Sequence, residues 1–390
     1  MAVNEVGNER KRIMLVVGEA SGDLHGSRVV RALHQKEPAV EISAVAGEAL
    51  RAEGVKVLFE VGRLTGMGFS ELAGNLANLW RAYSVLKREL TERRPDLLIL
   101  IDFPEFNLRL ARIAKRLGVP VLYYISPQVW AWRKRRVAEI ARSVDCMAVV
   151  FPFEVPLYEK AGLRVEFVGH PLLEVARSTR TREETLANLG LDPAKLTVAM
   201  LPGSRRREVA YHLPVMMEAA ELLEREMAVQ FVLVRASTVH DSGMTQAPDQ
   251  AAAWVSISDG DVYNVLHACD LAWTASGTAT LETGLMLRPM IIVYRLARLT
   301  YALARLLVRV EHVGMANILA GERVVPELIQ TEMTARRIVH ESKAILGDRG
   351  TRERIVAKLA GVREKLGQPG AAGRVADLAL QLMGEARLDS

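Results

Sequence analysis

Small and charged residues between predicted strands and helices carry the clearest chemistry in this sequence. One such stretch runs from Ser276 to Glu282, between an apolar run predicted as a buried strand and a predicted helix. This arrangement brings free backbone N–H groups and the positive end of a helix dipole to one point, which suits an anion. The turn could hold a phosphate while Glu282, further along the helix, meets ribose hydroxyls. The candidate phosphate ligands are Ser276, Gly277, Thr278 and Ala279. Alternatively, Ser276 and Thr278 only cap the helix.

A second stretch repeats this pattern. The predicted strand over residues 196–201 is followed by Gly203, Ser204 and Arg205, and then by a predicted helix. Gly203 allows a phosphate to approach the backbone, and Ser204 and the N–H groups can bind it. Arg205 adds a guanidinium that can pair with a diphosphate through two hydrogen bonds. The two stretches together predict a site for a nucleoside diphosphate.

A carboxylate follows the most apolar predicted strand, which ends at Ile101. The motif there is Asp102-Phe-Pro-Glu-Phe-Asn107. In doubly wound sheets, ligands bind at the carboxyl ends of the strands, so Asp102 could take a proton from a substrate hydroxyl. The alternative is a turn and helix cap with Pro104 at the first helical position.

The first predicted strand, over residues 13–17, leads into a turn with glycines at 18, 22 and 26. This spacing is not the G-x-G-x-x-G fingerprint of dinucleotide sites, so a nicotinamide site is not predicted. Ser21, Asp23 and His25 could line a cleft, but Ser21 or Asp23 could equally cap the following helix. His170, which precedes a proline, fits a hydrogen-bonded hinge residue better than a catalyst.

Three segments could contact an amphipathic or lipid ligand. Ser126 and Trp130 lie in an aromatic segment followed by basic residues at 133–136, which suits a phosphate-bearing amphipathic ligand. The loop containing Met67 precedes an apolar helical stripe over residues 72–86, which either packs in the core or seats in a lipid interface. Arg298, Arg305 and Arg309 form a basic helical face.

The totals predict a folded α/β protein of two domains. The chain has 390 residues, and half of them are apolar. Predicted strands and helices alternate in two separate series along the chain. We expect domains over residues 1–175 and 176–349, with closing helices over residues 350–390 that pack on the first domain or on a partner subunit. We expect no signal peptide and no membrane span.

The charge and residue content narrow the function classes. A net charge of +5 suits an anionic ligand or an anionic membrane surface, while 5% aromatic residues and the lack of long basic blocks argue against a nucleic-acid binder. Cys146 and Cys269 are predicted to be free buried thiols. Asp259-Gly-Asp261 has the D-x-D pattern of some metal-diphosphate sites, but its place before a helix favours a turn, so no metal is predicted.

Eight motifs in this order closely resemble those of lipid-A-disaccharide synthases, over about residues 13–330. They are Gly18-Glu-Ala-Ser-Gly-Asp23, Asp102-Phe-Pro-Glu-Phe-Asn107, Ser126-Pro-Gln-Val-Trp-Ala-Trp132, Phe151-Pro-Phe-Glu154, Val168-Gly-His-Pro-Leu172, Leu201-Pro-Gly-Ser-Arg205, Ala275-Ser-Gly-Thr-Ala-Thr-Leu-Glu282 and Asn317-Ile-Leu-Ala-Gly321. The resemblance implies the GT-B glycosyltransferase fold, in which two Rossmann-like halves face across a cleft.

The resemblance also implies an activity. Members join UDP-2,3-diacylglucosamine to 2,3-diacylglucosamine 1-phosphate in a β-1,6 linkage and release UDP, with inversion at the anomeric centre, in lipid A biosynthesis of Gram-negative bacteria. They act at the inner face of the cytoplasmic membrane without spanning it, and need no cofactor or metal. A homodimer is expected by analogy.

Residue roles follow from matching motif positions. Asp102 would be the base for the acceptor hydroxyl, Arg205 would hold the leaving diphosphate, and Glu282 would bind the ribose. The residues expected to line the acceptor cleft are Ser21, Asp23, Met67, Asn107, Ser126, Trp130 and Asn317. Two alternatives stay open: a related GT-B enzyme acting on another UDP-sugar or acceptor, and a nucleotide-binding protein docked on membranes without catalysis.

Overall fold

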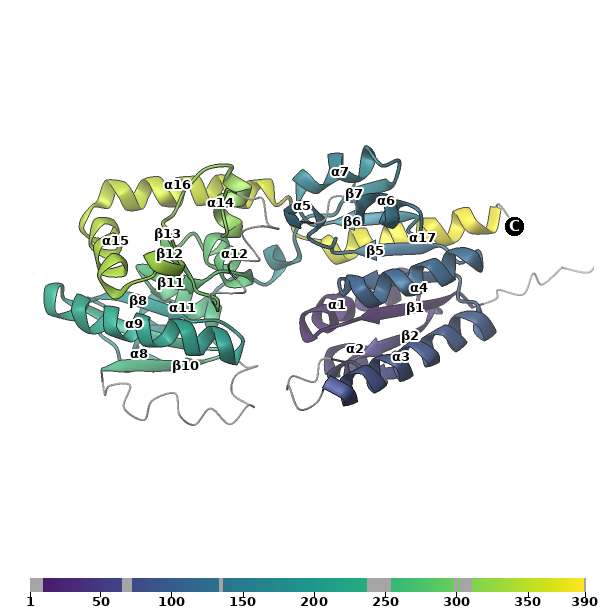
Figure 1. Ribbon diagram of the computed structural model, residues 1–390, viewed down its shortest axis with the longest axis horizontal. Helices are drawn as coiled ribbons and strands as arrows, with labels where there is room; N and C mark the ends of the chain where they lie inside the picture. The colour runs from purple at the N-terminus through teal and green to yellow at the C-terminus, as the bar shows by residue number, and fades with distance from the viewer. Residues whose placement is uncertain are drawn as a thin grey trace, which may run out of the picture. The chain divides into compact units, whose positions relative to one another are not determined.

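The chain forms two compact units, labelled by element in Figure 1. The computed structural model describes residues 10–64, 72–132, 136–236, 254–297, 301 and 311–388. Unit 1 is built from residues within 1–171 and 367–390, and unit 2 from residues within 172–366. Each unit has its own sheet and its own apolar core.

Unit 1 contains a parallel sheet. In its described residues seven strands pair in the order β3-β2-β1-β4-β5-β6-β7. Their bounds are β1 Arg12–Val17, β2 Glu41–Ala46, β3 Lys56–Glu60, β4 Leu97–Ile101, β5 Val121–Tyr124, β6 Cys146–Val149 and β7 Arg164–Phe167. β4 is buried along its whole length because helices cover both faces of the sheet, which explains its unbroken apolar sequence.

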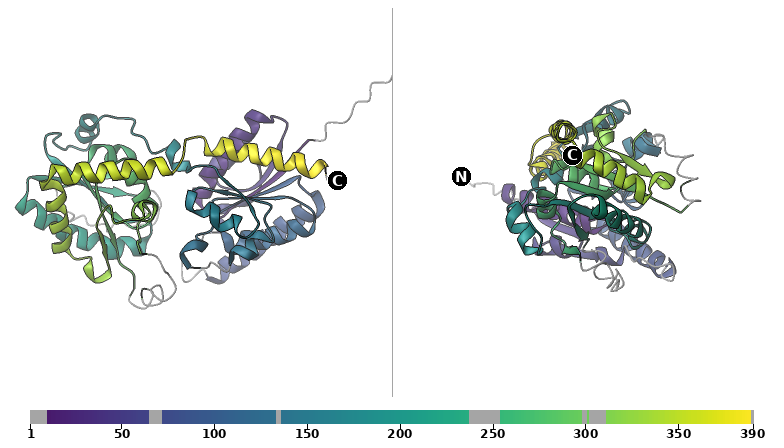
Figure 2. Two further views of the ribbon diagram at one scale, coloured as in Figure 1. Left: turned by 90° about the horizontal axis from the view of Figure 1, so that it is seen from above. Right: turned by 90° about the vertical axis from the view of Figure 1, so that its left-hand side faces the viewer.

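Helices cover the two faces of this sheet. α1 lies beside the last helix, α17, on one face, while α3 packs against α4 on the other (Figure 2). The bounds in unit 1 are α1 Ala20–Lys36, α2 Glu48–Ala52, α3 Leu72–Arg93, α4 Pro104–Arg116, α5 Val129–Trp132, α6 Arg136–Ala141, α7 Val155–Glu159 and α17 Ala371–Leu388. In the apolar stripe of α3, Leu86 is buried, whereas Trp80 is 72% exposed.

Unit 2 repeats the architecture with a second parallel sheet. In its described residues six strands pair in the order β10-β9-β8-β11-β12-β13. Their bounds are β8 Leu196–Leu201, β9 Val229–Arg235, β10 Val255–Asp259, β11 Leu271–Ala275, β12 Met290–Tyr294 and β13 Glu327–Ile329. Trp273 in β11 is fully buried, and its indole N–H donates to Ser342 Oγ at 2.9 Å on the overlying helix α15.

Helices cover both faces of the second sheet as well. α9 and α15 pack together on one face, and α11 and α12 lie on the other with α8, α14 and α16 against them. The bounds are α8 Arg182–Asn188, α9 Arg206–Glu226, α11 Val262–Ala268, α12 Thr278–Leu285, α14 Met315–Ala320, α15 Ala335–Gly347 and α16 Arg349–Lys365.

The chain passes between the units twice. It leaves unit 1 after Pro171 and returns after Leu366. The predicted domain boundaries, at residues 175 and 349, differ from these points and place α16 among the closing helices. In the structure α16 packs on α12 and α14 of unit 2, and α17 alone returns to contact α1, β4 and β5 of unit 1.

Candidate active site

Unit 1 has a topological switch point between β1 and β4. These neighbouring strands lead into α1 and α4, which lie on opposite faces of the sheet. Ligands of open α/β sheets bind beyond the strand ends at such points. The residue after β1 is Gly18 and the residue after β4 is Asp102, so the structure brings these two predicted motifs together at one edge of unit 1.

The turn after β4 has an unusual backbone. Asp102 and Phe103 both have φ of +49°, in the left-handed region that non-glycine residues rarely adopt. The Phe103 side chain packs against the turn after β1. A Cβ atom added to Gly18 would lie 2.2 Å from Phe103 Cγ. Gly18 is therefore a glycine because Phe103 packs directly against it.

Buried polar groups hold this turn in place from behind. The Asp102 carbonyl accepts hydrogen bonds from Asn107 Nδ2 at 2.8 Å and from the Tyr123 hydroxyl. Asn107 Nδ2 also lies 3.3 Å from the Ile101 carbonyl, and the Asp102 N–H donates to the Tyr124 carbonyl at 3.2 Å. Asn107 and Tyr123 are both fully buried. These contacts offset the cost of the left-handed backbone, which is on the order of 1–3 kcal/mol per residue.

Asp102 itself is exposed at the edge of unit 1. Protein packed around it desolvates the carboxylate and raises its pKa, although a hydrogen bond from the Phe103 N–H opposes that shift. The negative charge of Glu19, at the start of α1, raises the pKa further. A carboxylate with a raised pKa is a better proton acceptor, so Asp102 has the environment of a general base.

Unit 2 has its own switch point, between β8 and β11. The turn after β8 contains Gly203, Ser204 and Arg205 and leads into α9. The turn after β11 contains Ser276 and Gly277 and leads into α12, whose first residues are Thr278 and Ala279. The two stretches predicted to bind a nucleoside diphosphate therefore lie at the ends of neighbouring strands of one sheet.

The turn after β11 suits close approach by a ligand. Gly277 has a φ of +140°, and a Cβ atom added there would have no neighbour within 4 Å. Ser276 does not cap α12: its hydroxyl donates to the Val313 carbonyl at 3.1 Å. Thr278 is exposed at the first position of the helix. An open glycine at a helix N-terminus is the arrangement that phosphate groups bind.

Glu282 lies on α12 beside α11. One of its carboxylate oxygens accepts a hydrogen bond from the Tyr263 hydroxyl at 2.9 Å. Burial raises the pKa of Glu282, while this hydrogen bond works in the opposite direction. Glu282 is partly buried, and among the described residues the Tyr263 hydroxyl is its recorded hydrogen-bond partner.

Comparison with known proteins identifies the family. The sequence model of the lipid-A-disaccharide synthetase family matches residues 13–371. The chain belongs to this family. It is 49% identical to the lipid-A-disaccharide synthase of Geobacter metallireducens over 97% of this chain and 98% of that protein. It is 41% identical to that of Myxococcus xanthus over 97% of this chain and 99% of that protein.

Solved structures show the fold. The chain superposes on a UDP complex of MnaA from S. aureus with a TM-score of 0.64 at 13% identity, covering 95% of this chain and 97% of the other. The calicheamicin glycosyltransferase CalG4 gives a TM-score of 0.60 at 14% identity, covering 96% and 99%. The two parallel-sheet units of this lipid-A-disaccharide synthase family member are those of the GT-B fold, as predicted.

Three residues of the predicted acceptor cleft are buried and bind the protein itself. Asp23 accepts hydrogen bonds from the N–H groups of Gly47 and Ala49 at 2.6 and 2.9 Å, and so caps α2. Asn107 holds the Asp102 turn, as described above. Asn317 is fully buried and joins the Val325 carbonyl and Glu327 through Nδ2 at 3.0 and 2.8 Å. In this structure these three side chains hydrogen-bond to turns of the protein, and their predicted place in the acceptor cleft stays a prediction.

The other predicted cleft residues have different surroundings. Ser21 is exposed near the start of α1. Ser126 is buried, with its hydroxyl 2.6 Å from that of Tyr158, and the Trp130 ring packs edge-on against Phe153. The Trp130 indole N–H is buried, and its contact with the Glu154 carboxylate opposes the raised pKa of that group. Met67, Arg298, Arg305 and Arg309 lie outside the described residues, as does the Trp132 side chain.

His212, which is not among the predicted site residues, joins the loop after β8 to the end of β12 in unit 2. It is fully buried on α9, its Nδ1–H donates to the Pro202 carbonyl at 2.7 Å, and its Nε2 accepts from the Arg295 N–H at 3.0 Å. Burial lowers the pKa of His212, which keeps the ring neutral and able to make both bonds. A histidine among the apolar positions of a helix was the available signal. It ties the loop before Arg205 to the end of β12.

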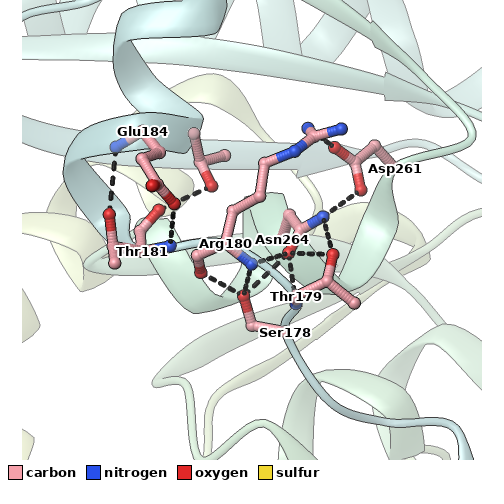
Figure 3. Close-up of polar contacts among 8 residues, drawn as sticks. Ser178, Thr179, Arg180, Thr181, Glu184, Asp261 and Asn264 are labelled. Atoms are coloured by element: carbon pink, nitrogen blue, oxygen red, sulfur yellow. Dashed lines mark hydrogen bonds and ion pairs between the residues drawn. The ribbon is translucent and has the colours of Figure 1, made fainter.

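Asp259 and Asp261 are paired with protein groups. Asp259 pairs with Arg235 at 2.6 Å, and Asp261 pairs with Arg180 at 2.6 Å and accepts from Asn264 Nδ2 at 2.7 Å. Figure 3 shows that Asn264 also binds Ser178 and the backbone of Thr179 and so fastens the incoming chain to α11. Among the described residues, no group of three or more His, Cys, Asp or Glu side chains could hold a metal ion.

Proposed function

We propose that this protein joins UDP-2,3-diacylglucosamine to 2,3-diacylglucosamine 1-phosphate, giving the β-1,6-linked lipid A disaccharide 1-phosphate and UDP. The observation that carries the proposal is the Asp102 carboxylate at the switch point of unit 1, in a chain of the lipid-A-disaccharide synthase family. Its raised pKa and its rigid turn suit the removal of a proton from an alcohol.

The reaction is a single displacement. Asp102 takes the proton of the acceptor 6-hydroxyl as that oxygen attacks the anomeric carbon of the donor from the face opposite UDP. The bond from the anomeric carbon to the diphosphate oxygen breaks, its electron pair stays on UDP, and the configuration inverts. One carbon–oxygen bond forms, one breaks, and the proton ends on Asp102.

The groups of unit 2 hold the donor. The N–H groups and Arg205 after β8, with the open turn at Gly277 after β11, bind the diphosphate, and Glu282 binds the ribose. Negative charge grows on the diphosphate as the bond breaks, so Arg205 stabilises the transition state more than the ground state. A guanidinium and a helix N-terminus supply the charge stabilisation for which other enzymes use a metal, and we propose a metal-independent reaction.

The diacylated substrates require contact with lipid. We propose that the protein works as a peripheral protein at the inner face of the cytoplasmic membrane. Trp80, which is 72% exposed on α3, and the net charge of +5 support such contact. Among the described helices, none is both long and apolar enough to cross a membrane. We also propose a homodimer, by analogy with the family alone.

A product assay tests the proposed function. The purified protein is mixed with UDP-2,3-diacylglucosamine and 2,3-diacylglucosamine 1-phosphate in the presence of EDTA. The mass of the lipid product is then measured by mass spectrometry. We expect the disaccharide 1-phosphate and an equal amount of UDP. Product from a different radiolabelled UDP-sugar alone would favour a related enzyme. UDP binding without any product would indicate a nucleotide-binding protein without catalysis.

A further inference from the structure

The Glu208 carboxylate occupies the turn after β8. One of its oxygens accepts a hydrogen bond from the Ser204 N–H at 3.2 Å, and the other accepts from Arg205 Nη1 at 3.1 Å. The Glu208 side chain is only 15% exposed, whereas its partner Arg205 is 63% exposed. A carboxylate is therefore held under the turn, on two of the donors that this turn presents.

Gly203 shows how closely this carboxylate packs. A Cβ atom added to Gly203 would lie 2.7 Å from Glu208 Cβ and 2.7 Å from Glu208 Oε2. The sequence pattern suggested that Gly203 leaves room for a phosphate. In the structure that room is filled by the side chain of Glu208, so an anion already lies where the turn can accept one.

The charges around Glu208 make this contact favourable without a ligand. Arg205 and the N–H groups at the start of α9 are positive, and an acidic residue in the first helical turn is stabilised by the helix dipole. Glu208 also contributes to the electrostatic environment of two neighbours, because its charge raises the pKa of Tyr294 and opposes the lowering of the pKa of His212.

We propose that Glu208 is a built-in competitor that occupies the diphosphate site of the free protein and is displaced by the diphosphate of the donor. This inference rests on the proposed function, in which Ser204 and Arg205 bind the diphosphate. The hydrogen bonds from the Ser204 N–H and from Arg205 pass from the Glu208 carboxylate to phosphate oxygens. Binding is then an exchange of one anion for another, which lowers the affinity for UDP and lets the product leave.

The alternative role for Glu208 predicts the opposite change in affinity. If the carboxylate positions Arg205 for the ligand, its removal weakens UDP binding, because the guanidinium loses its orientation. If the carboxylate competes with the ligand, its removal strengthens UDP binding, because two like charges no longer share one turn. The sign of the change therefore separates a competitor from a positioning residue.

Titration calorimetry of the full chain with UDP provides the test. Glu208→Gln removes the charge and keeps the shape, and Glu208→Ala is a second variant in case the amide folds poorly. We expect the Kd for UDP to fall about three- to tenfold in either variant. The Kd for uridine, which has no phosphate, should stay the same. Glu218→Gln is the matched control, since it removes an exposed charge from the same helix.

The outcomes are distinct. An unchanged or higher Kd for UDP in both Glu208 variants, with UDP still bound by the unmodified protein, overturns the competitor and leaves the proposed function intact. Failure of the unmodified protein and of both variants to bind UDP overturns the proposed function and the competitor with it. An equal fall in the Kd for uridine would also contradict the inference, because the gain would not depend on phosphate.

Discussion

The turn that carries Asp102 and the two turns at the switch point of unit 2 are built in different ways. In unit 1 the backbone is strained, with left-handed Asp102 and Phe103, and buried side chains hold its carbonyl from behind. In the two switch-point turns of unit 2, positive φ is confined to Gly203 and Gly277, which adopt it at no steric cost. The polar side chains of these turns, such as Arg205 and Thr278, are exposed.

This difference matches the chemistry proposed for each unit. A general base must present one oxygen in one direction, and fixing its backbone removes the cost of orienting it during the reaction. A diphosphate has many oxygens, and several N–H groups can share it, so an open turn with an exchangeable carboxylate serves as well. The rigid turn should therefore be sensitive to changes behind it, and the open turns to changes of charge.

Asp102→Asn should have the largest effect. The amide cannot take a proton, so we expect turnover to fall about 10³- to 10⁴-fold. The Kd for UDP should stay unchanged, because the proposed nucleotide ligands belong to unit 2. Glu105→Gln, on an exposed carboxylate in the first turn of α4, is the control and should keep its activity. Substantial turnover by Asp102→Asn would remove the proposed mechanism.

Arg205→Ala should have the next largest effect, and it tests the open turn. Loss of the guanidinium removes a donor from the leaving diphosphate, and we expect kcat to fall about 10²- to 10³-fold. Unlike Asp102→Asn, this change should also weaken UDP binding. Arg206→Ala removes the adjacent exposed arginine and provides the control in the same kinetic assay. Equal losses in the two variants would show only a general effect of charge.

Asn107→Leu should have a smaller effect, through the position of Asp102. The change leaves the carbonyls of Ile101 and Asp102 without this donor, and we expect a loss of stability of about 1–3 kcal/mol, measured by urea unfolding. We expect kcat to fall about tenfold with little change in KM for the donor. Tyr123→Phe, which removes the other donor to the Asp102 carbonyl, should shift kcat in the same direction.

Control variant Ser143→Ala separates stability from positioning. Ser143 is buried in unit 1, and its hydroxyl donates to the Glu139 carbonyl at 3.1 Å, far in sequence from the Asp102 turn. It should lose stability without losing kcat. A full kcat in Asn107→Leu would mean that the strained turn holds its shape without the clamp.

The sequence predicted much of the fold because the strands are continuous apolar runs. The strand predicted over residues 196–201 is found at Leu196–Leu201, and the run ending at Ile101 is found at Leu97–Ile101. Parallel strands buried on both faces need such runs, so the sequence pattern is strong. Cys146 and Cys269 are free and buried, as predicted.

Contacts between distant residues could not be predicted in the same way. Asp23 caps α2 by accepting a hydrogen bond from the N–H of Gly47, which is 24 residues further along the chain. Nothing in the local sequence of Asp23 points to that helix. Asn317 and His212 likewise bind loops rather than their own turns. The helix α16 belongs to unit 2 because Leu359 and its neighbours pack in the core of that unit. The spacing of apolar residues predicts a helix there but does not say against which unit the helix packs.

The left-handed backbone at Asp102 could not be predicted from the sequence either. No glycine marks that turn, and Asp-Phe-Pro predicts an ordinary helix start. The conformation is imposed by Phe103 packing on Gly18 and by Asn107 behind it. By contrast, Gly203 and Gly277 mark the turns of unit 2 in the sequence. The stretches proposed to bind the nucleotide were therefore easier to predict than the surroundings of Asp102.

A change of pH should affect unit 1 through groups that the reaction does not use. Burial raises the pKa of Glu154 to about 8, although hydrogen bonds from Phe151 and Ser126 oppose the shift. The folded state therefore binds a proton that the unfolded state releases between about pH 4.5 and 8. Stability from this group is present at low pH and is lost as pH rises toward 8.

Two buried histidines act in the opposite direction. Burial lowers the pKa of His25 to about 4 and that of His170 to about 3. Below about pH 6.5 the unfolded state takes up protons that the folded state refuses, so stability is lost as pH falls. Glu154 and the histidines together should give unit 1 a stability maximum at an intermediate pH.

Glu154→Gln should have the smallest effect on turnover and should reduce the loss of stability on the alkaline side of this maximum. Between pH 6 and 8 we expect the unfolding temperature of the variant to fall less than that of the unmodified protein. The corresponding difference in the free energy of unfolding should be a few kcal/mol at most. Between about pH 4.5 and 6.5 the stability of the variant should rise more steeply with pH, because His25 and His170 remain and Glu154 no longer opposes them. Glu159→Gln, on a nearby exposed carboxylate, should leave both sides as they are. Calorimetry at a series of pH values measures all three proteins. If stability falls as steeply between about pH 6.5 and 8 in Glu154→Gln as in the unmodified protein, the buried carboxyl group does not contribute to the pH dependence.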